Sequence, residues 1–153
     1  MYRKIFSLTM TLLWMYVIFS FSAKSAAESG ADSMFITDYI IRFFINNPSQ
    51  YLLDIIETII RKLAHFTEYA VLGALVCYCM RSFGVGIKLL AYSILICFVY
   101  AVSDEVHQYF VPGRACRVYD MLVDTMGSAC GYYLYRIILK IRHAYKISLF
   151  TNT

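Results

Sequence analysis

Long apolar runs limit most strongly what this chain can fold into. The first run, residues 5–23, contains no charged residue, and a helix needs about 20 mostly apolar residues to cross the roughly 30 Å hydrocarbon core of a bilayer. Hydrophobic residues make up 60% of the 153-residue chain, against about 45–50% in a soluble domain. We therefore expect an all-α membrane protein. One domain covering residues 1–153 is predicted to fold as a four-helix transmembrane bundle, with spans at about 5–23, 63–80, 87–102 and 119–139.

The first run has two interpretations. Small residues from Ser22 to Ala27 would suit a signal peptidase. However, the uninterrupted apolar run is longer than the core of a usual signal peptide, which has about 7–15 residues. We expect a retained signal anchor, with a cleaved signal peptide as the alternative.

The segment 28–62 is predicted to form an outer loop and an amphipathic interfacial helix. Residues 28–47 begin polar and then carry an apolar, aromatic patch around Phe43. Asn47 and Pro48 indicate a helix start, because proline is favoured at the first helical position. Apolar residues then recur at helical spacing, namely Leu52, Ile55, Ile56, Ile59, Ile60 and Leu63. We expect this interfacial helix to lead directly into the second span.

Basic residues gather at one end of the predicted bundle. Four spans place both termini on one side of the membrane, and that side collects Arg3, Lys4, Arg81, Lys88, Arg136, Lys140, Arg142 and Lys146. Positively charged flanks mark the cytoplasmic side. The sequence therefore predicts cytoplasmic N- and C-termini.

The last three spans each carry polar side chains on one face of the outer end. A helix turns by about 100° per residue, so residues three or four apart share a face. The second span contributes Lys62, His65, Glu68 and Tyr69; the third contributes Asp104, Glu105, His107 and Gln108; the fourth contributes Asp120, Asp124, Gly127 and Gly131. The glycines form a GxxxG pair, which lets another helix approach closely. We predict that these faces meet in a polar pocket that opens outward.

Ionisable groups in this set are the candidate functional residues. A charged side chain at mid-bilayer costs about 2.5–3.5 kcal/mol on insertion scales, so such groups usually mark function. Glu68 and Asp124 are the deepest by this reckoning. Lys62, Asp104 and Asp120 lie nearer the interface, where ordinary flanking charges are an equal alternative.

Two acids stand at an unfavourable place. Asp104 and Glu105 lie near the end of the third span, where the helix dipole disfavours negative charge. They require a local reason, such as a cation, a shared proton or a bound ligand. The available cations are Lys62, Arg114 and Arg117.

Three blocks of this sequence resemble the VanZ-like family of bacterial membrane proteins. They are RKLAHFTEY at 61–69, SDEVHQYFVPGR at 103–114 and DMLVDTMG at 120–127, in the family's order. The resemblance runs from Ile5 to about Leu139. It implies a small multi-pass protein of the bacterial cytoplasmic membrane, and the family's named member confers low-level resistance to the glycopeptide antibiotic teicoplanin.

One short stretch departs from that pattern. After Arg114 the chain continues as Ala115-Cys116-Arg117, where we expect small or glycine-containing residues. The departure concerns the conformation of this loop, because the flanking acids and Arg114 are present.

Three functions stay open at this point. A membrane-embedded enzyme would act on an outward-facing lipid-linked or cell-wall substrate, with acids and imidazoles that move protons or hold a divalent cation. Its candidate catalytic residues are His65, Glu68, Asp104, Glu105, His107, Asp120 and Asp124, and its candidate ligand-binding residues are Lys62, Gln108 and Arg114. The alternatives are a protein that shields the cell envelope from an antibiotic, and a proton- or ion-coupled carrier.

The expected partners are the lipid bilayer and a cell-wall or lipid-linked ligand. Nucleic acid is not expected. The sequence indicates no particular metal, cofactor or oligomeric state.

Overall fold

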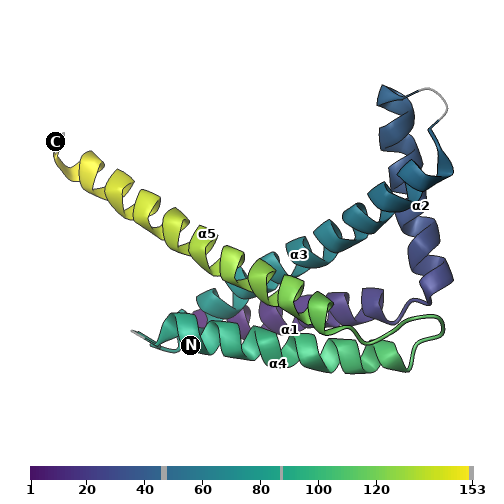
Figure 1. The fold of residues 1–153 in the computed structure, drawn as a ribbon. Helices are drawn as coiled ribbons and strands as arrows, with labels where there is room; N and C mark the ends of the chain where they lie inside the picture. The colour runs from purple at the N-terminus through teal and green to yellow at the C-terminus, as the bar shows by residue number, and fades with distance from the viewer. Residues whose placement is uncertain (46–47, 87, 152–153) are drawn as a thin grey trace.

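Five helices make up the computed structural model, which describes residues 1–45, 48–86 and 88–151. They are α1 (Tyr2–Ser22), α2 (Ala26–Phe44), α3 (Gln50–Ser82), α4 (Leu89–Tyr109) and α5 (Val118–Thr151). Helices α1 and α4 lie along the base of Figure 1, α3 and α5 cross above them, and α2 rises beside the start of α3. No strand occurs within the described ranges, so the all-α prediction is confirmed.

Three of the described helices are long and apolar enough to cross a membrane. By length and composition these are α1, α3 and α4, which overlap the first three predicted spans. The predicted third span starts slightly early, because α4 begins at Leu89 and Ile87 lies outside the described residues. The predicted fourth span, 119–139, falls within α5, which is not among the three.

The predicted interfacial helix and second span form one continuous helix. Helix α3 has 33 residues, and its N-cap is Ser49, whose side chain accepts a hydrogen bond from the Leu52 backbone. Pro48 therefore precedes the helix and does not open it, while Asn47 lies outside the described residues. The helix runs without a break from its N-cap at Ser49 to its C-cap at Phe83. The polar side chains between the two predicted parts therefore do not interrupt it.

A separate helix occupies the region between α1 and α3. Helix α2 starts with a capping box, in which the Ser25 side chain accepts from the Glu28 backbone and the Glu28 carboxylate accepts from Ser25. These hydrogen bonds lower the pKa of Glu28, that from the Ser25 side chain most. The Ser-x-x-Glu signature at residues 25–28 is typical of a helix start and would have predicted this helix from the sequence. Aromatic side chains on α2 stay exposed, Phe35, Tyr39 and Phe43 among them.

Helices α3 and α5 cross with their backbones in close contact. A Cβ atom added to Gly127 would collide with the Phe66 carbonyl, and one added to Gly131 would collide with the backbone of Ala70. Both glycine contacts run forward along the two chains, so α3 and α5 point the same way. The close approach predicted from the GxxxG pair is confirmed.

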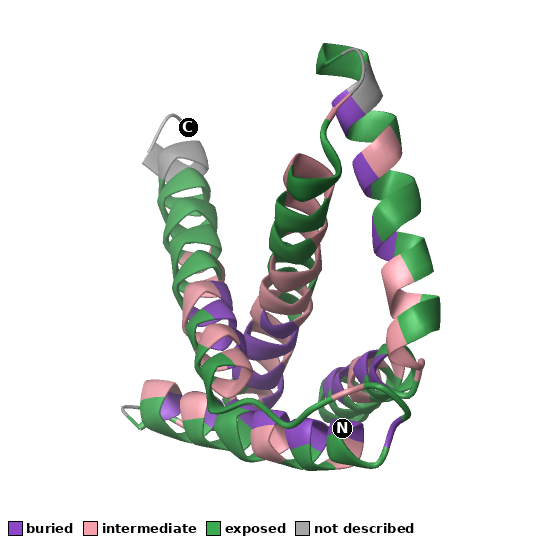
Figure 2. Cartoon of the chain, turned by 45° about the vertical axis from the view of Figure 1, so that its right-hand side comes forward, coloured by how far each residue is buried: buried purple, intermediate pink, exposed green. Residues whose placement is uncertain are grey.

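Buried residues concentrate around this crossing. Tyr69, Leu72 and Val76 of α3 pack against Ile18 of α1 and Cys97 of α4. Figure 2 shows the buried residues where the helices meet, while the surfaces that face away from the bundle are largely exposed. Many of those exposed side chains are large and apolar, as expected for helices in contact with lipid.

The bundle has two chemically different ends. At one end, Ser7 of α1 hydrogen-bonds Ser82 of α3 at 2.8 Å, and the ammonium of Lys4 lies 5.3 Å from the ring of Phe83. At the other end, the last turns of α1 and α4 meet each other, and Glu105 of α4 binds the loop residue Arg117 just before α5. The predicted polar residues lie at this second end.

Replacing Gly131 with alanine is expected to destabilise the fold by about 1–3 kcal/mol, because the new methyl group overpacks the α3–α5 crossing. The thermal unfolding midpoint of the purified protein in detergent measures the effect. Gly30→Ala is the matched control, since Gly30 is also helical and its added Cβ would lie 3.6 Å from the nearest atom, an ordinary contact. Equal midpoints for the two variants would contradict the close crossing.

Candidate functional site

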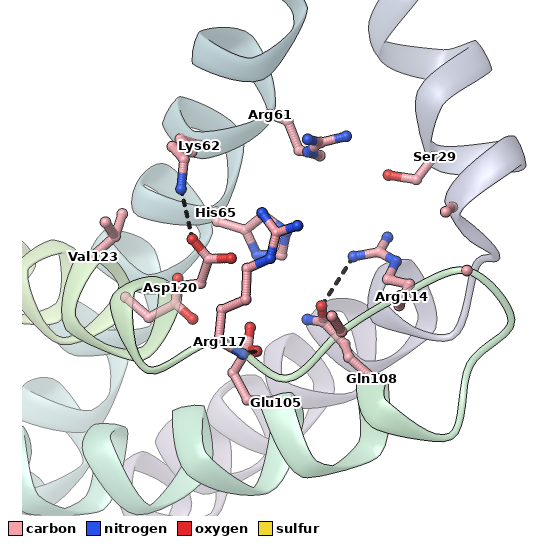
Figure 3. A pocket seen from close by; sticks show the side chains of 14 residues that line it. Ser29, Arg61, Lys62, His65, Glu105, Gln108, Arg114, Arg117, Asp120 and Val123 are labelled. Atoms are coloured by element: carbon pink, nitrogen blue, oxygen red, sulfur yellow. Dashed lines mark hydrogen bonds and ion pairs between the residues drawn. The ribbon is translucent and has the colours of Figure 1, made fainter.

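A cavity of about 110 Å³ lies where the polar end of the bundle meets the start of α2. Side chains from α2, α3, α4 and α5 line it, together with the loop that joins α4 to α5 (Figure 3). Its walls are formed by Ala26, Ser29, Arg61, Lys62, His65, Glu105, Gln108, Gly113, Arg114, Ala115, Arg117, Asp120, Val123 and Asp124. The structure thus joins residues from all three predicted faces in one pocket.

Three guanidinium groups line this cavity. Figure 3 shows Arg61, Arg114 and Arg117 turned toward one space, with the imidazole of His65 beside them. The guanidinium of Arg61 lies 3.7 Å from Glu57. Burial lowers the pKa of Arg114, and the nearby charge of Arg61 lowers it further. Like charges therefore face one another here.

Arg114 is held in place through the loop. Its Nε donates to the Lys24 carbonyl at 3.1 Å, and its Nη1 donates to Oε1 of Gln108, also at 3.1 Å. The loop itself is tied to α2, because the Ala26 backbone N–H donates to the Pro112 carbonyl. Gly113 has a φ of 75°, a conformation that glycine adopts without strain.

Asp104 supports this arginine from behind the cavity. Its carboxylate is 2% exposed and does not line the cavity. Oδ2 accepts hydrogen bonds from Ser22 at 2.7 Å and from the Gln108 amide at 3.1 Å. A chain of contacts therefore runs from Asp104 through Gln108 to the guanidinium of Arg114.

Glu105 fixes the far side of the loop. It is 1% exposed, and its Oε2 accepts the backbone N–H of Arg117 at 2.7 Å. Acids at the end of a helix are disfavoured by the helix dipole and need a stabilising partner. For Glu105, the Arg117 backbone N–H is that partner. The hydrogen bond also aims the Arg117 side chain back toward the cavity (Figure 3).

The predicted polar faces of α3 and α5 meet through an ion pair. Lys62 Nζ lies 2.6 Å from Oδ1 of Asp120 and 4.5 Å from the centroid of the Tyr119 ring. Both charges are partly exposed and largely offset each other. Lys62 therefore adds little to the net charge that a ligand would meet.

Asp124 is the unusual acid of the site. It lines the cavity, is only 1% exposed, and neither of its carboxylate oxygens has a hydrogen-bond partner within the described residues. A buried polar group without a partner costs about 1–3 kcal/mol. The fold tolerates this cost in a cavity that His65 and Arg117 also line, so Asp124 is the strongest candidate for a role in function.

Three predicted site residues lie outside this cavity: Asp104, described above, Glu68 and His107. Glu68 lines a second cavity of about 180 Å³ between α1, α2 and α3. His107 lines neither cavity and stacks on Phe19 of α1, with 4.4 Å between the ring centroids. The end of α4 is rotated so that Gln108 faces the cavity while His107 packs against α1.

The described residues do not form a metal-binding cluster. Across the described ranges, no three His, Cys, Asp or Glu side chains are grouped closely enough to hold a metal ion. The carboxylates of Asp104, Glu105 and Asp120 each contact a different partner.

Some site residues escaped sequence analysis. Ser22 was considered only as part of a cleavage site, yet it hydrogen-bonds Asp104. Arg61 and Ser29 line the cavity and were not among the predicted site residues. The position of Arg61 beside Lys62, on the turn before His65, was the available signal.

Exchanging Asp124 for asparagine should leave the thermal unfolding midpoint unchanged or raise it, because a neutral amide is easier to bury without partners than a carboxylate. Asp104→Asn provides the contrast. There, charge-assisted hydrogen bonds become neutral ones of about half the strength, so the midpoint should fall. A similar fall in both variants would contradict the different environments of the two acids.

Comparison with known proteins agrees with the resemblance found in the sequence. The family model for VanZ/LLP1 matches residues 7–139, which include all the residues that line the cavity. No curated protein and no solved structure matches the chain significantly. Because the match covers most of its length, this chain belongs to the VanZ/LLP1 family.

Proposed function

We propose that this protein works in the cell envelope by binding the phosphate or carboxylate group of a lipid-linked or cell-wall component in the cavity. The convergence of Arg61, Arg114 and Arg117 carries the proposal. Guanidinium groups form paired hydrogen bonds with these anions and suit them better than an ammonium does. An anion bound between them would relieve the repulsion of like charges.

The balance of charge around the cavity supports an anionic ligand. Asp120 offsets Lys62 across 2.6 Å, and Glu105 is engaged by the loop backbone. Asp104 is directed toward Ser22 and Gln108, away from the arginines. These three acids are thus occupied, whereas Asp124 lines the cavity without a hydrogen-bond partner within the described residues.

We further propose four spans with both termini in the cytoplasm. Helix α5 lies against α3 at Phe66 and Ala70, and α3 is itself a candidate span. Residues 119–139 would therefore cross the bilayer beside α3 and in the same direction. The basic residues near both termini would then face the cytoplasm, and the cavity would open outside the cytoplasmic membrane.

Cys116 offers a direct measurement of this topology, because it is exposed in the loop beside the cavity while Cys77, Cys79 and Cys97 are buried. A membrane-impermeant maleimide should label it in intact cells, and Cys116→Ser should remove that label. Arg142→Cys in the Cys116→Ser background should react only after the cells are opened. Labelling of both positions in intact cells would show that α5 does not span.

Membership in the VanZ/LLP1 family bears on the biological role. The resemblance to VanZ suggests that the protein acts on or protects envelope components, and protection against teicoplanin would be one consequence. Asp124 favours an enzyme as the second candidate, since a carboxylate without partners lies on the cavity wall together with His65. Such a pair would suit general acid–base chemistry.

Anion binding itself can be measured on the purified protein in phosphatidylcholine nanodiscs. Inorganic phosphate should raise the thermal unfolding midpoint of the wild type, because a ligand that binds only the folded state stabilises it. With Arg114→Gln, about tenfold more phosphate should be needed for the same rise in midpoint, which corresponds to a loss of about 1.4 kcal/mol in binding free energy. Arg142→Gln, an exposed change outside the cavity, should leave it intact. A wild-type midpoint that does not respond to phosphate would contradict the proposal.

A further inference from the structure

A second cavity adjoins the arginine-lined one. It measures about 180 Å³ and lies between the end of α1, the first half of α2 and α3. Ser29, Arg61, His65 and Arg114 line both cavities. The two spaces are therefore neighbours separated by the same cationic side chains.

The second cavity is chemically unlike the first. Phe21, Ile36, Ile60 and Ala64 give it apolar walls on three helices. Lys24 and Asp32 at its edge form an ion pair, with 2.6 Å between Nζ and Oδ2, so their charges offset each other. An aliphatic chain is better suited to these walls than a polar group.

Ser33 and Glu68 are the polar exceptions on those walls. Both can accept a hydrogen bond from a donor near the chain, such as a hydroxyl, because the Ser33 hydroxyl donates its own proton to the Ser29 carbonyl. The cavity, of about 180 Å³, suits part of one aliphatic chain.

We infer that the two cavities together bind one amphiphile, a lipid phosphate with a single aliphatic chain. Its phosphate lies among Arg61, Arg114 and Arg117, and its chain lies between α2 and α3 against Ile36, Ile60 and Ala64. This inference rests on the proposed anion site and names the class of ligand that the site takes. Phosphate is favoured over carboxylate because three guanidinium groups surround one space, and a phosphate monoester offers oxygens to each.

The exposed aromatic face of α2 is consistent with such a ligand. Phe35, Tyr39 and Phe43 are each more than three quarters exposed, and aromatic side chains are enriched where membrane meets water. A helix lying at that depth would border the second cavity with lipid. A single-chain lipid would then reach the cavity from the bilayer surface without crossing water.

The test compares three probes on the full-length protein in phosphatidylcholine nanodiscs: lysophosphatidic acid, inorganic phosphate and lysophosphatidylcholine. Isothermal titration calorimetry, with empty nanodiscs as the blank, gives each dissociation constant. Lysophosphatidic acid should bind at least about tenfold more tightly than inorganic phosphate, because its chain gains an apolar site. Lysophosphatidylcholine has the chain without a net negative head and should bind more weakly than lysophosphatidic acid.

A variant that fills the second cavity separates the chain site from the anion site. Ala64→Phe should weaken lysophosphatidic acid about tenfold, toward the affinity of inorganic phosphate, and leave inorganic phosphate unchanged. Ala64 is exposed and helical, and Ala64→Leu serves if the larger side chain prevents folding. Leu63→Phe is the matched control, since Leu63 is 57% exposed and lines neither cavity.

The outcomes distinguish this inference from the proposed function. Equal affinities for lysophosphatidic acid and inorganic phosphate, both weakened by Arg114→Gln, would overturn the chain site and leave the anion site standing. Lysophosphatidylcholine binding as tightly as lysophosphatidic acid would overturn the assignment of a phosphate ligand. No binding of lysophosphatidic acid or of inorganic phosphate would overturn both proposals.

Discussion

The crossing of α3 and α5 positions everything else in this molecule. Without side chains at Gly127 and Gly131, the backbones approach closely enough for Phe66 and Ala70 to lie against α5. That contact sets the first turn of α5 beside the middle of α3, and so brings Asp120 to Lys62. Apolar burial alone gives no such register, because apolar side chains slide past one another at little cost in a lipid environment.

Around this fixed pair, the site is assembled mainly by hydrogen bonds at helix ends. The last turn of α4 supplies Asp104, Glu105 and Gln108, which bind α1, the loop and Arg114 in turn. Acids at a helix C-terminus are unfavourable for the helix itself. Here they organise a loop that carries cations, so local helix stability is exchanged for a defined arrangement of charge.

The sequence predicted the all-α fold and the helices α1, α3 and α4, because apolar runs and helical residue spacing are visible in the sequence, but it did not predict α2 as a separate helix. It predicted the close contact at Gly127 and Gly131 for the same reason. Spacing within one helix does not report how that helix is rotated against its neighbours, so His107 was placed in the pocket although it packs on Phe19. Glu68 was predicted to lie in the same pocket as the other acids, but it lines the second cavity, which adjoins the first. The direct continuation of the interfacial helix into the second span was predicted, and α3 joins the two parts in one helix.

The hydrogen bond from Ala26 to Pro112 has a mechanical consequence. Together with the bond from Arg114 to the Lys24 carbonyl, it couples the first turn of α2 rigidly to the arginine loop, while Arg61 stays on α3. Any tilt of α2 relative to α3 therefore changes the spacing between the guanidinium groups of Arg61 and Arg114. The position of α2 therefore helps to set how far apart these two guanidinium groups lie.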